Sequence, residues 1–167
     1  MAEREQSSGG MRQFLGIILT TLGILTALGF FSYDWKDIPF LRVPPNTPPL
    51  NYIGPAGAWF SFVTLMSFGY AAFLFPLFFF ALGGLLMFRP GDPIPGRFSW
   101  GLVVVMAGAG LLQLHPDWIA GLNDQFNLLG IEGGLFGLFV GKRACAGLLG
   151  DTGANVVAIG FLVGGTI

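Results

Sequence analysis

Long uncharged apolar stretches alternate with short charged clusters along the chain. All Asp, Glu, Lys and Arg residues fall into these clusters, and together they make up 10% of the 167 residues. A membrane-spanning helix needs about 17 to 25 predominantly apolar residues. The uncharged stretches therefore predict four spans, at about residues 14–31, 68–88, 98–114 and 152–167. The predicted fold is an all-α integral membrane domain at residues 13–167, preceded by a tail at residues 1–12.

The first stretch, residues 14–31, has two possible interpretations. A cleaved signal peptide has an apolar region of about 7 to 15 residues that ends in a small-x-small cleavage site. Residues 14–31 exceed that length and end in Phe30 and Phe31. As a helix they would measure roughly 27 Å, close to the ~30 Å hydrocarbon core. We therefore interpret this stretch as a retained span.

The second uncharged stretch, residues 43–88, is too long for one span. Two proline pairs make residues 43–52 an extended loop, because proline cannot continue a helix. The remainder would measure about 51 Å as one helix, more than the hydrocarbon core. We predict an interfacial helix from Pro55 to about Met66, with Trp59 at headgroup depth, and a change of direction near residues 67–69.

Two features within residues 68–88 predict local geometry. Pro76 lies in the outer half of the predicted span, where it would free the carbonyl of Ala72 and kink the helix. Gly83 and Gly84 would allow a neighbouring helix to approach closely.

The third span, residues 98–114, follows a loop at residues 89–97 that is rich in proline and glycine. Such a short loop predicts a helical hairpin, with the second and third spans antiparallel. Trp100 and Trp118 bracket the third span in the manner of interface anchors. His115 precedes Pro116 at its far end, and we favour a structural role for it over a role as proton relay or ligand.

Residues 117–151 predict a second interfacial or re-entrant helix. Gly133, Gly137 and Gly141 form a Gly-x-x-x-Gly series that is typical of helix packing, whereas Lys142 and Arg143 interrupt the stretch before it is long enough to span. In the last span, residues 152–167, the small residues Gly160 and Gly164 also permit close approach. We expect both glycine series to support self-association.

The Lys and Arg residues predict the orientation only weakly. The two sides carry equal numbers, Arg4, Arg12, Arg89 and Arg97 against Lys36, Arg42, Lys142 and Arg143. Arg89 and Arg97 lie directly at span ends, and most acidic residues lie on the other side. Both termini are therefore expected in the cytoplasm, with the interfacial helices and Cys145 on the extracytoplasmic side.

Composition excludes several functions. The hydrophobic content of 53% and the mean hydropathy of +0.71 are those of a membrane protein, and the net charge of -1 provides no field for binding nucleic acid. The single cysteine, Cys145, excludes an intramolecular disulfide and multi-cysteine metal sites, and we interpret it as a small apolar side chain.

Motifs for catalysis are also missing. Gly141-Lys142 does not fit a phosphate-binding loop, because Phe136 stands in place of the first glycine and Arg143 in place of Ser or Thr. Asp34 and Asp37 are interpreted as capping residues at a span boundary rather than as a catalytic pair. We predict no enzyme activity and no catalytic, cofactor-binding or metal-binding residues. No ionisable side chain lies within a predicted span, which counts against an ion-coupled transporter.

Several short motifs, taken in order, resemble the N-terminal membrane domain of the FtsK/SpoIIIE septal DNA translocases. The resemblance covers nearly the whole chain. Its motifs are Ser32-Tyr33-Asp34 with Asp37, Asn51 with the segment GPAGAW from Gly54, Phe68-Gly69-Tyr70-Ala71-Ala72 before Pro76, the glycines Gly133, Gly134, Gly137 and Gly141, and Leu148-Leu149-Gly150 with Gly153-Ala154.

This resemblance implies a four-span domain in the bacterial inner membrane, with both termini cytoplasmic. It implies a role in anchoring a hexameric DNA-pumping motor at the division septum and in contacting other division proteins. The linker and ATPase that follow the fourth span in that family are absent from this sequence, so we expect no motor activity. Two alternatives remain: a small polytopic transporter or channel subunit, and a membrane-assembly protein unrelated to division.

Overall fold

The regular secondary structure of the chain is helical throughout the part that the structure describes. The computed structural model describes residues 2–88, 94–122, 126–128 and 130–166. The α-helices are α1 (Ala2–Phe31), α2 (Gly54–Phe68), α3 (Leu74–Phe88), α4 (Ile94–Leu114), α6 (Gly134–Phe136) and α7 (Gly147–Thr166). The 3-10 helices are η1 (Trp35–Asp37), η2 (Gly69–Phe73) and η3 (Pro116–Leu122), and η4 (Gly137–Ala146) is a π-helix.

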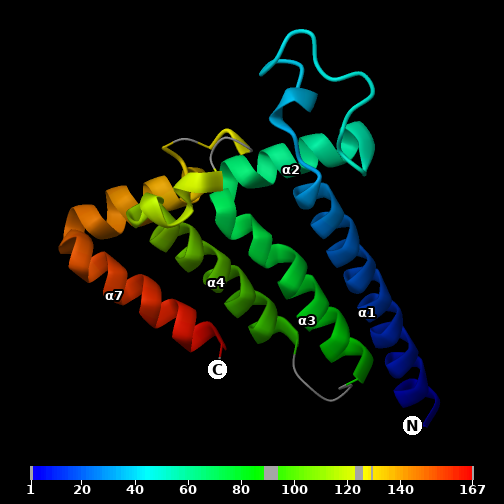
Figure 1. Ribbon diagram of the computed structural model, residues 1–167. Helices are drawn as coiled ribbons and strands as arrows, with labels where there is room; N and C mark the ends of the chain where they lie inside the picture. Colours follow the sequence, from blue (N-terminus) through cyan, green and yellow to red (C-terminus); the bar gives the residue numbers. More distant parts are fainter. Residues whose placement is uncertain (1, 89–93, 123–125, 129, 167) are drawn as a thin grey trace.

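Four helices, α1, α3, α4 and α7, lie side by side in a row (Figure 1). Both termini lie on the same side of this row, at the lower ends of α1 and α7 in the view of Figure 1. On the opposite side, α2 and η4 run across the ends of the helices, and the loop before α2 projects beyond them (Figure 1). We call the described residues on this side, 32–73, 115–122, 126–128 and 130–150, the cap layer. The predicted interfacial helices correspond to α2 and η4.

Small residues bring α1 and α3 together. A Cβ atom at Gly83 of α3 would lie 2.5 Å from Thr20 Oγ1 and 2.9 Å from the carbonyl oxygen of Gly16, both on α1. Such distances leave no room for a side chain, so the close approach predicted at Gly83 is confirmed. Gly84 has no atom within 4 Å of its added Cβ and does not contribute.

The helices α3 and α4 pack antiparallel through aromatic rings. The ring centroids of Phe78 on α3 and Phe98 on α4 lie 5.6 Å apart, and the Phe78 ring fills the space that a side chain at Gly101 would need. The antiparallel hairpin is therefore confirmed (Figure 1). Of the predicted loop, residues 94–97 belong to α4, and residues 89–93 lie outside the described residues.

Three described stretches, Gly10–Phe31, Gly54–Phe88 and Gly134–Gly165, are long and apolar enough to cross a membrane, and Phe98–Leu114 is a shorter apolar helix. Large apolar side chains remain exposed along them, such as Phe14 on α1, Leu77 on α3 and Val156 on α7. Apolar side chains are stable on this surface when lipid surrounds it. The all-α membrane fold predicted from the sequence is thus confirmed.

The prediction of a kink at Pro76 is wrong. The helix α3 begins at Leu74, so Pro76 occupies its first turn, where no intrahelical partner for a backbone N–H is required. Ala72 lies in the 3-10 helix η2 rather than in a continuous α-helix. The change of direction takes place at Gly69, between α2 and η2, as predicted for residues 67–69.

Candidate interaction surface

The loop between α1 and α2 is held by one buried carboxylate. Asp37 is 7% exposed and accepts three hydrogen bonds, from Asn46 Nδ2 at 2.8 Å, Leu50 N at 3.0 Å and Asn51 N at 2.9 Å. A carboxylate that accepts backbone N–H groups satisfies donors that would otherwise be costly to bury. Asp37 therefore fixes a loop of more than a dozen residues around a single point.

Further side chains connect this loop to α1. Asn51 is buried and donates from Nδ2 to the Gly29 carbonyl at 2.8 Å, while its Oδ1 accepts from Ile53 N at 3.0 Å. Tyr52 N donates to Ser32 Oγ at 2.9 Å. Asp34 accepts from Lys36 N at 2.8 Å and so caps η1. The capping role predicted for Asp34 is confirmed, and Asp37 likewise serves the backbone.

Aromatic packing joins the loop between α1 and α2 to helix α2. Phe40 contacts Trp59 and Phe62 of α2, with ring centroids 5.7 and 5.3 Å apart. Beyond this contact, the loop leaves large apolar side chains exposed: Val43 is 86% exposed and Tyr52 is 77% exposed. A backbone that is fixed by hydrogen bonds and presents apolar groups outward is suited to docking.

The joint between α2 and η2 locks the two halves of the cap layer together. Gly69 has φ 60° and ψ -145°, and a side chain there would collide with the backbone carbonyl of Glu132. Tyr70 N donates to that carbonyl at 2.9 Å. Close by, the buried Phe126 stacks on Tyr33 and packs edge-on against Tyr70. The residues between α4 and η4 thus contribute to the core beneath the first loop.

The glycine series Gly133, Gly137 and Gly141 packs against another helix of the same chain. Side chains at Gly133 and Gly137 would overlap the carbonyl of Ala109 on α4, and a Cβ at Gly141 would lie 2.7 Å from Gly110 Cα. The predicted helix-packing role is confirmed, but the partner is α4 of the same chain. This series therefore does not form the self-association face that we expected. Gly160, in contrast, has no atom within 4 Å of its added Cβ.

Polar side chains that the sequence analysis did not single out hold the turn before η4. Gln113 of α4 is buried; its Oε1 accepts from Gly133 N and its Nε2 donates to the Gly130 carbonyl, each at 3.1 Å. The buried Glu132 accepts from Gly130 N at 3.0 Å. The sequence feature that could have predicted this role is the amide side chain of Gln113 within an apolar stretch. Such a polar group in a membrane needs hydrogen-bond partners inside the protein.

His115 connects α4 to α7. Its Nε2 lies 2.9 Å from Asn155 Oδ1, and its ring stacks on Trp118 with centroids 4.5 Å apart. These contacts agree with the structural role favoured from the sequence. Trp100 is 48% exposed and Trp118 is 63% exposed, as interface anchors would be.

Burial raises the pKa of the Tyr33 phenol well above its ordinary value of 10.0, and the nearby Asp34 and Asp37 add to the rise. Tyr33 is thus neutral at physiological pH and acts as an aromatic packing residue. Among the described residues, no group of three or more His, Cys, Asp or Glu side chains is placed to hold a metal ion. The described part of the cap layer can present a shaped surface, and it offers no cluster suited to metal chemistry.

The row of apolar helices and the ordered cap layer together define a polytopic helical membrane domain. Within that class, the chain belongs to the family described as the 4TM region of DNA translocase FtsK/SpoIIIE, which matches residues 9–167. The resemblance inferred from the sequence is therefore confirmed.

Two relatives agree with this assignment. The chain is 28% identical over 173 residues to the DNA translocase FtsK of Pseudomonas putida, a match that covers 98% of this chain and 20% of that protein. It is also 28% identical over 150 residues to the DNA translocase FtsK of Pseudomonas syringae, covering 84% of this chain and 18% of that protein. The chain thus spans about a fifth of the length of these relatives. No solved structure matches it.

Proposed function

We propose that this domain positions an FtsK-type DNA translocase at the division septum by docking its cap layer to other division proteins. The observation that carries the proposal is the loop at residues 32–53. Asp37 and Asn51 hold its backbone, while Val43 and Tyr52 point apolar side chains outward. An ordered surface loses little conformational entropy on binding, which favours docking.

The remaining parts of the proposal concern topology and assembly. Both termini lie on the same side of the row of helices, opposite the cap layer, which is compatible with both being cytoplasmic and the cap layer being extracytoplasmic (Figure 1). The domain would form a homo-oligomer, a hexamer by analogy with the family. It would contribute no catalysis of its own, since the matched region is the membrane region of the translocase.

A fluorescent fusion tests the septal role. The unaltered protein should collect at midcell, and Val43→Ser combined with Tyr52→Ser should reduce the midcell fraction severalfold, because both side chains belong to the proposed docking surface and neither supports the fold. Val156→Ser on α7, also largely exposed at 67%, is the matched control and should leave recruitment unchanged. The amount of fusion protein in the membrane fraction should be equal for the unaltered protein and the variants.

Two outcomes would count against this function. Uniform fluorescence of the unaltered protein around the envelope would refute septal positioning. Normal midcell recruitment of the double variant would show that the loop is not the docking surface.

A further inference from the structure

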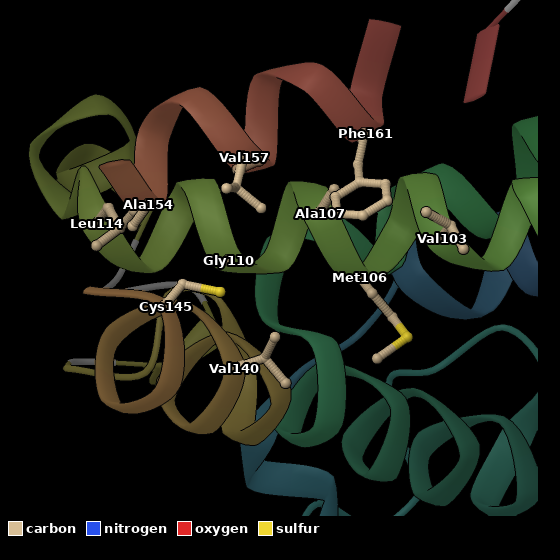
Figure 2. A pocket seen from close by; sticks show the side chains of 12 residues that line it. Val103, Met106, Ala107, Gly110, Leu114, Val140, Cys145, Ala154, Val157 and Phe161 are labelled. Carbon is tan, nitrogen blue, oxygen red and sulfur yellow. The ribbon is translucent and has the colours of Figure 1, made fainter. Parts of the chain in front are cut away.

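A hollow of about 220 Å³ lies between α4, η4 and α7. Its lining is almost entirely apolar. Figure 2 shows Met106, Val140, Cys145, Val157 and Phe161 around it, with Gly110 leaving room at its centre. An apolar cavity of about 150 Å³ already accommodates a benzene-sized ligand. This hollow is therefore large enough for a segment of hydrocarbon chain.

The hollow runs along the helices rather than across them. On α4 it extends from Leu114, beside the cap layer, to Val103, a rise of roughly 16 Å. The opposite wall extends on α7 from Ala154 to Phe161. The long axis of the hollow therefore follows the direction that lipid chains take beside membrane-spanning helices.

Two cations follow directly after a residue of η4 that lines the hollow. Gly141 of η4 lines the hollow, and Lys142 and Arg143 follow it directly and are exposed. The Arg143 guanidinium lies over the Phe139 ring, 5.3 Å from its centroid. No carboxylate of the described residues forms an ion pair with either cation, although the exposed Asp151 lies nearby in sequence. Both cations are therefore exposed and available to an anion.

We propose that this hollow and the adjoining Lys142-Arg143 pair form a binding site for an anionic phospholipid. One acyl chain lies in the hollow between α4 and α7, and the phosphate group contacts the two cations of η4. Basic groups at membrane depth attract anionic headgroups, and the guanidinium fork suits phosphate oxygens. This inference goes beyond septal docking and does not depend on it.

The test compares lipid retention by the full chain in mild detergent, using native mass spectrometry with phosphatidylglycerol and phosphatidylcholine of equal chain length. The unaltered protein should retain phosphatidylglycerol preferentially. Lys142→Gln with Arg143→Gln should lower this preference roughly thirtyfold. Arg42→Gln removes another exposed cation of the cap layer, away from the hollow, and should have little effect.

A second variant tests the acyl-chain part. Ala107→Phe would fill the hollow and should reduce retention of both lipids while leaving the headgroup preference intact; Ala158→Phe repeats the test from the opposite wall if the first variant does not fold. If Arg42→Gln lowered the preference for phosphatidylglycerol as much as the Lys142 and Arg143 double variant does, the proposed site would be wrong. So would displacement of the lipid by glycerol phosphate at equal concentration, which would indicate a free phosphate site. If the variant that fills the hollow instead lost a second copy of the protein from the complex seen in native mass spectrometry, the hollow would be an interface between copies of this chain.

Discussion

Replacing Asp37 should loosen the loop at residues 32–53 without disturbing the membrane helices. Its carboxylate is the common acceptor of three donors, and of these Asn51 N is buried. In Asp37→Asn, one oxygen can still accept from Asn46 and Leu50, whose bonds both go to Oδ1. The new amide group, however, would then direct a donor toward Asn51 N.

The expected cost follows from that geometry. A buried donor that loses its acceptor costs about 1 to 3 kcal/mol, so Asp37→Asn should destabilise the closed loop by about 2 kcal/mol. Asp37→Ala removes both acceptor oxygens and so all three hydrogen bonds, but Asn46 and Leu50 are exposed enough to bond to water. Its cost should therefore rise only to about 3 kcal/mol.

Hydrogen–deuterium exchange of peptides covering residues 46–53 measures this opening. A loss of about 2 kcal/mol corresponds to roughly 25-fold faster exchange at the protected amides. Asp34→Asn is the matched control, because Asp34 accepts one bond, from Lys36 N, and asparagine caps a helix about as well as aspartate. The reasoning fails if Asp34→Asn accelerates exchange at Leu50 and Asn51 as much as Asp37→Asn does, or if neither change accelerates it.

Two further predictions concern the joint and the core of the cap layer. Gly69→Ala should lower the stability of the reconstituted protein in thermal unfolding by more than about 2 kcal/mol, because it adds a side chain at positive φ against the Glu132 carbonyl. The control is Gly84→Ala on α3, where the added Cβ meets no atom within 4 Å, and it should be neutral or slightly stabilising. Equal effects of the two substitutions would contradict the packing described at Gly69. The folded state holds the Tyr33 proton more tightly than the unfolded state, so stability should be independent of this group below pH 10 and should fall as the pH rises above it. Tyr33→Phe should reduce that alkaline loss, and an identical pH profile for the variant would contradict it.

Several elements were predictable because their signals are local. An apolar stretch of sufficient length, such as residues 14–31, specifies a span without reference to the rest of the chain. Excess length in residues 55–88 likewise required a break, and glycine is the residue best suited to the backbone angles found at Gly69. The break at Gly150, with φ 71° and ψ 170°, separates the end of the cap layer from the main part of α7 in the same way.

Other features depend on contacts distant in sequence. Nothing near Gly133 indicates that Ala109 would be its neighbour, so the sequence predicted a packing face without identifying the partner. The role of Asp37 depends on Leu50 and Asn51 returning to it across the loop. Pro76 was misplaced because the start of α3 was predicted too early, and a proline kinks a helix only beyond its first turn.

The two halves of the chain, α1 to α3 and α4 to α7, have the same order of structural elements. Each half contains a long helix, a loop, a transverse helix and a second long helix after a glycine joint (Figure 1). The turns before the transverse helices match, since Gly54 N donates to the Asn51 carbonyl at 2.8 Å and Gly134 N donates to the Ile131 carbonyl at 2.7 Å. Both halves expose apolar side chains, such as Val43 in the first and Leu148 in the second, but the adjacent pair of exposed cations, Lys142 and Arg143, belongs to the second. Because the two proposed sites lie on different halves, changes to the loop should alter septal recruitment but not lipid preference, and changes to the two cations should do the reverse.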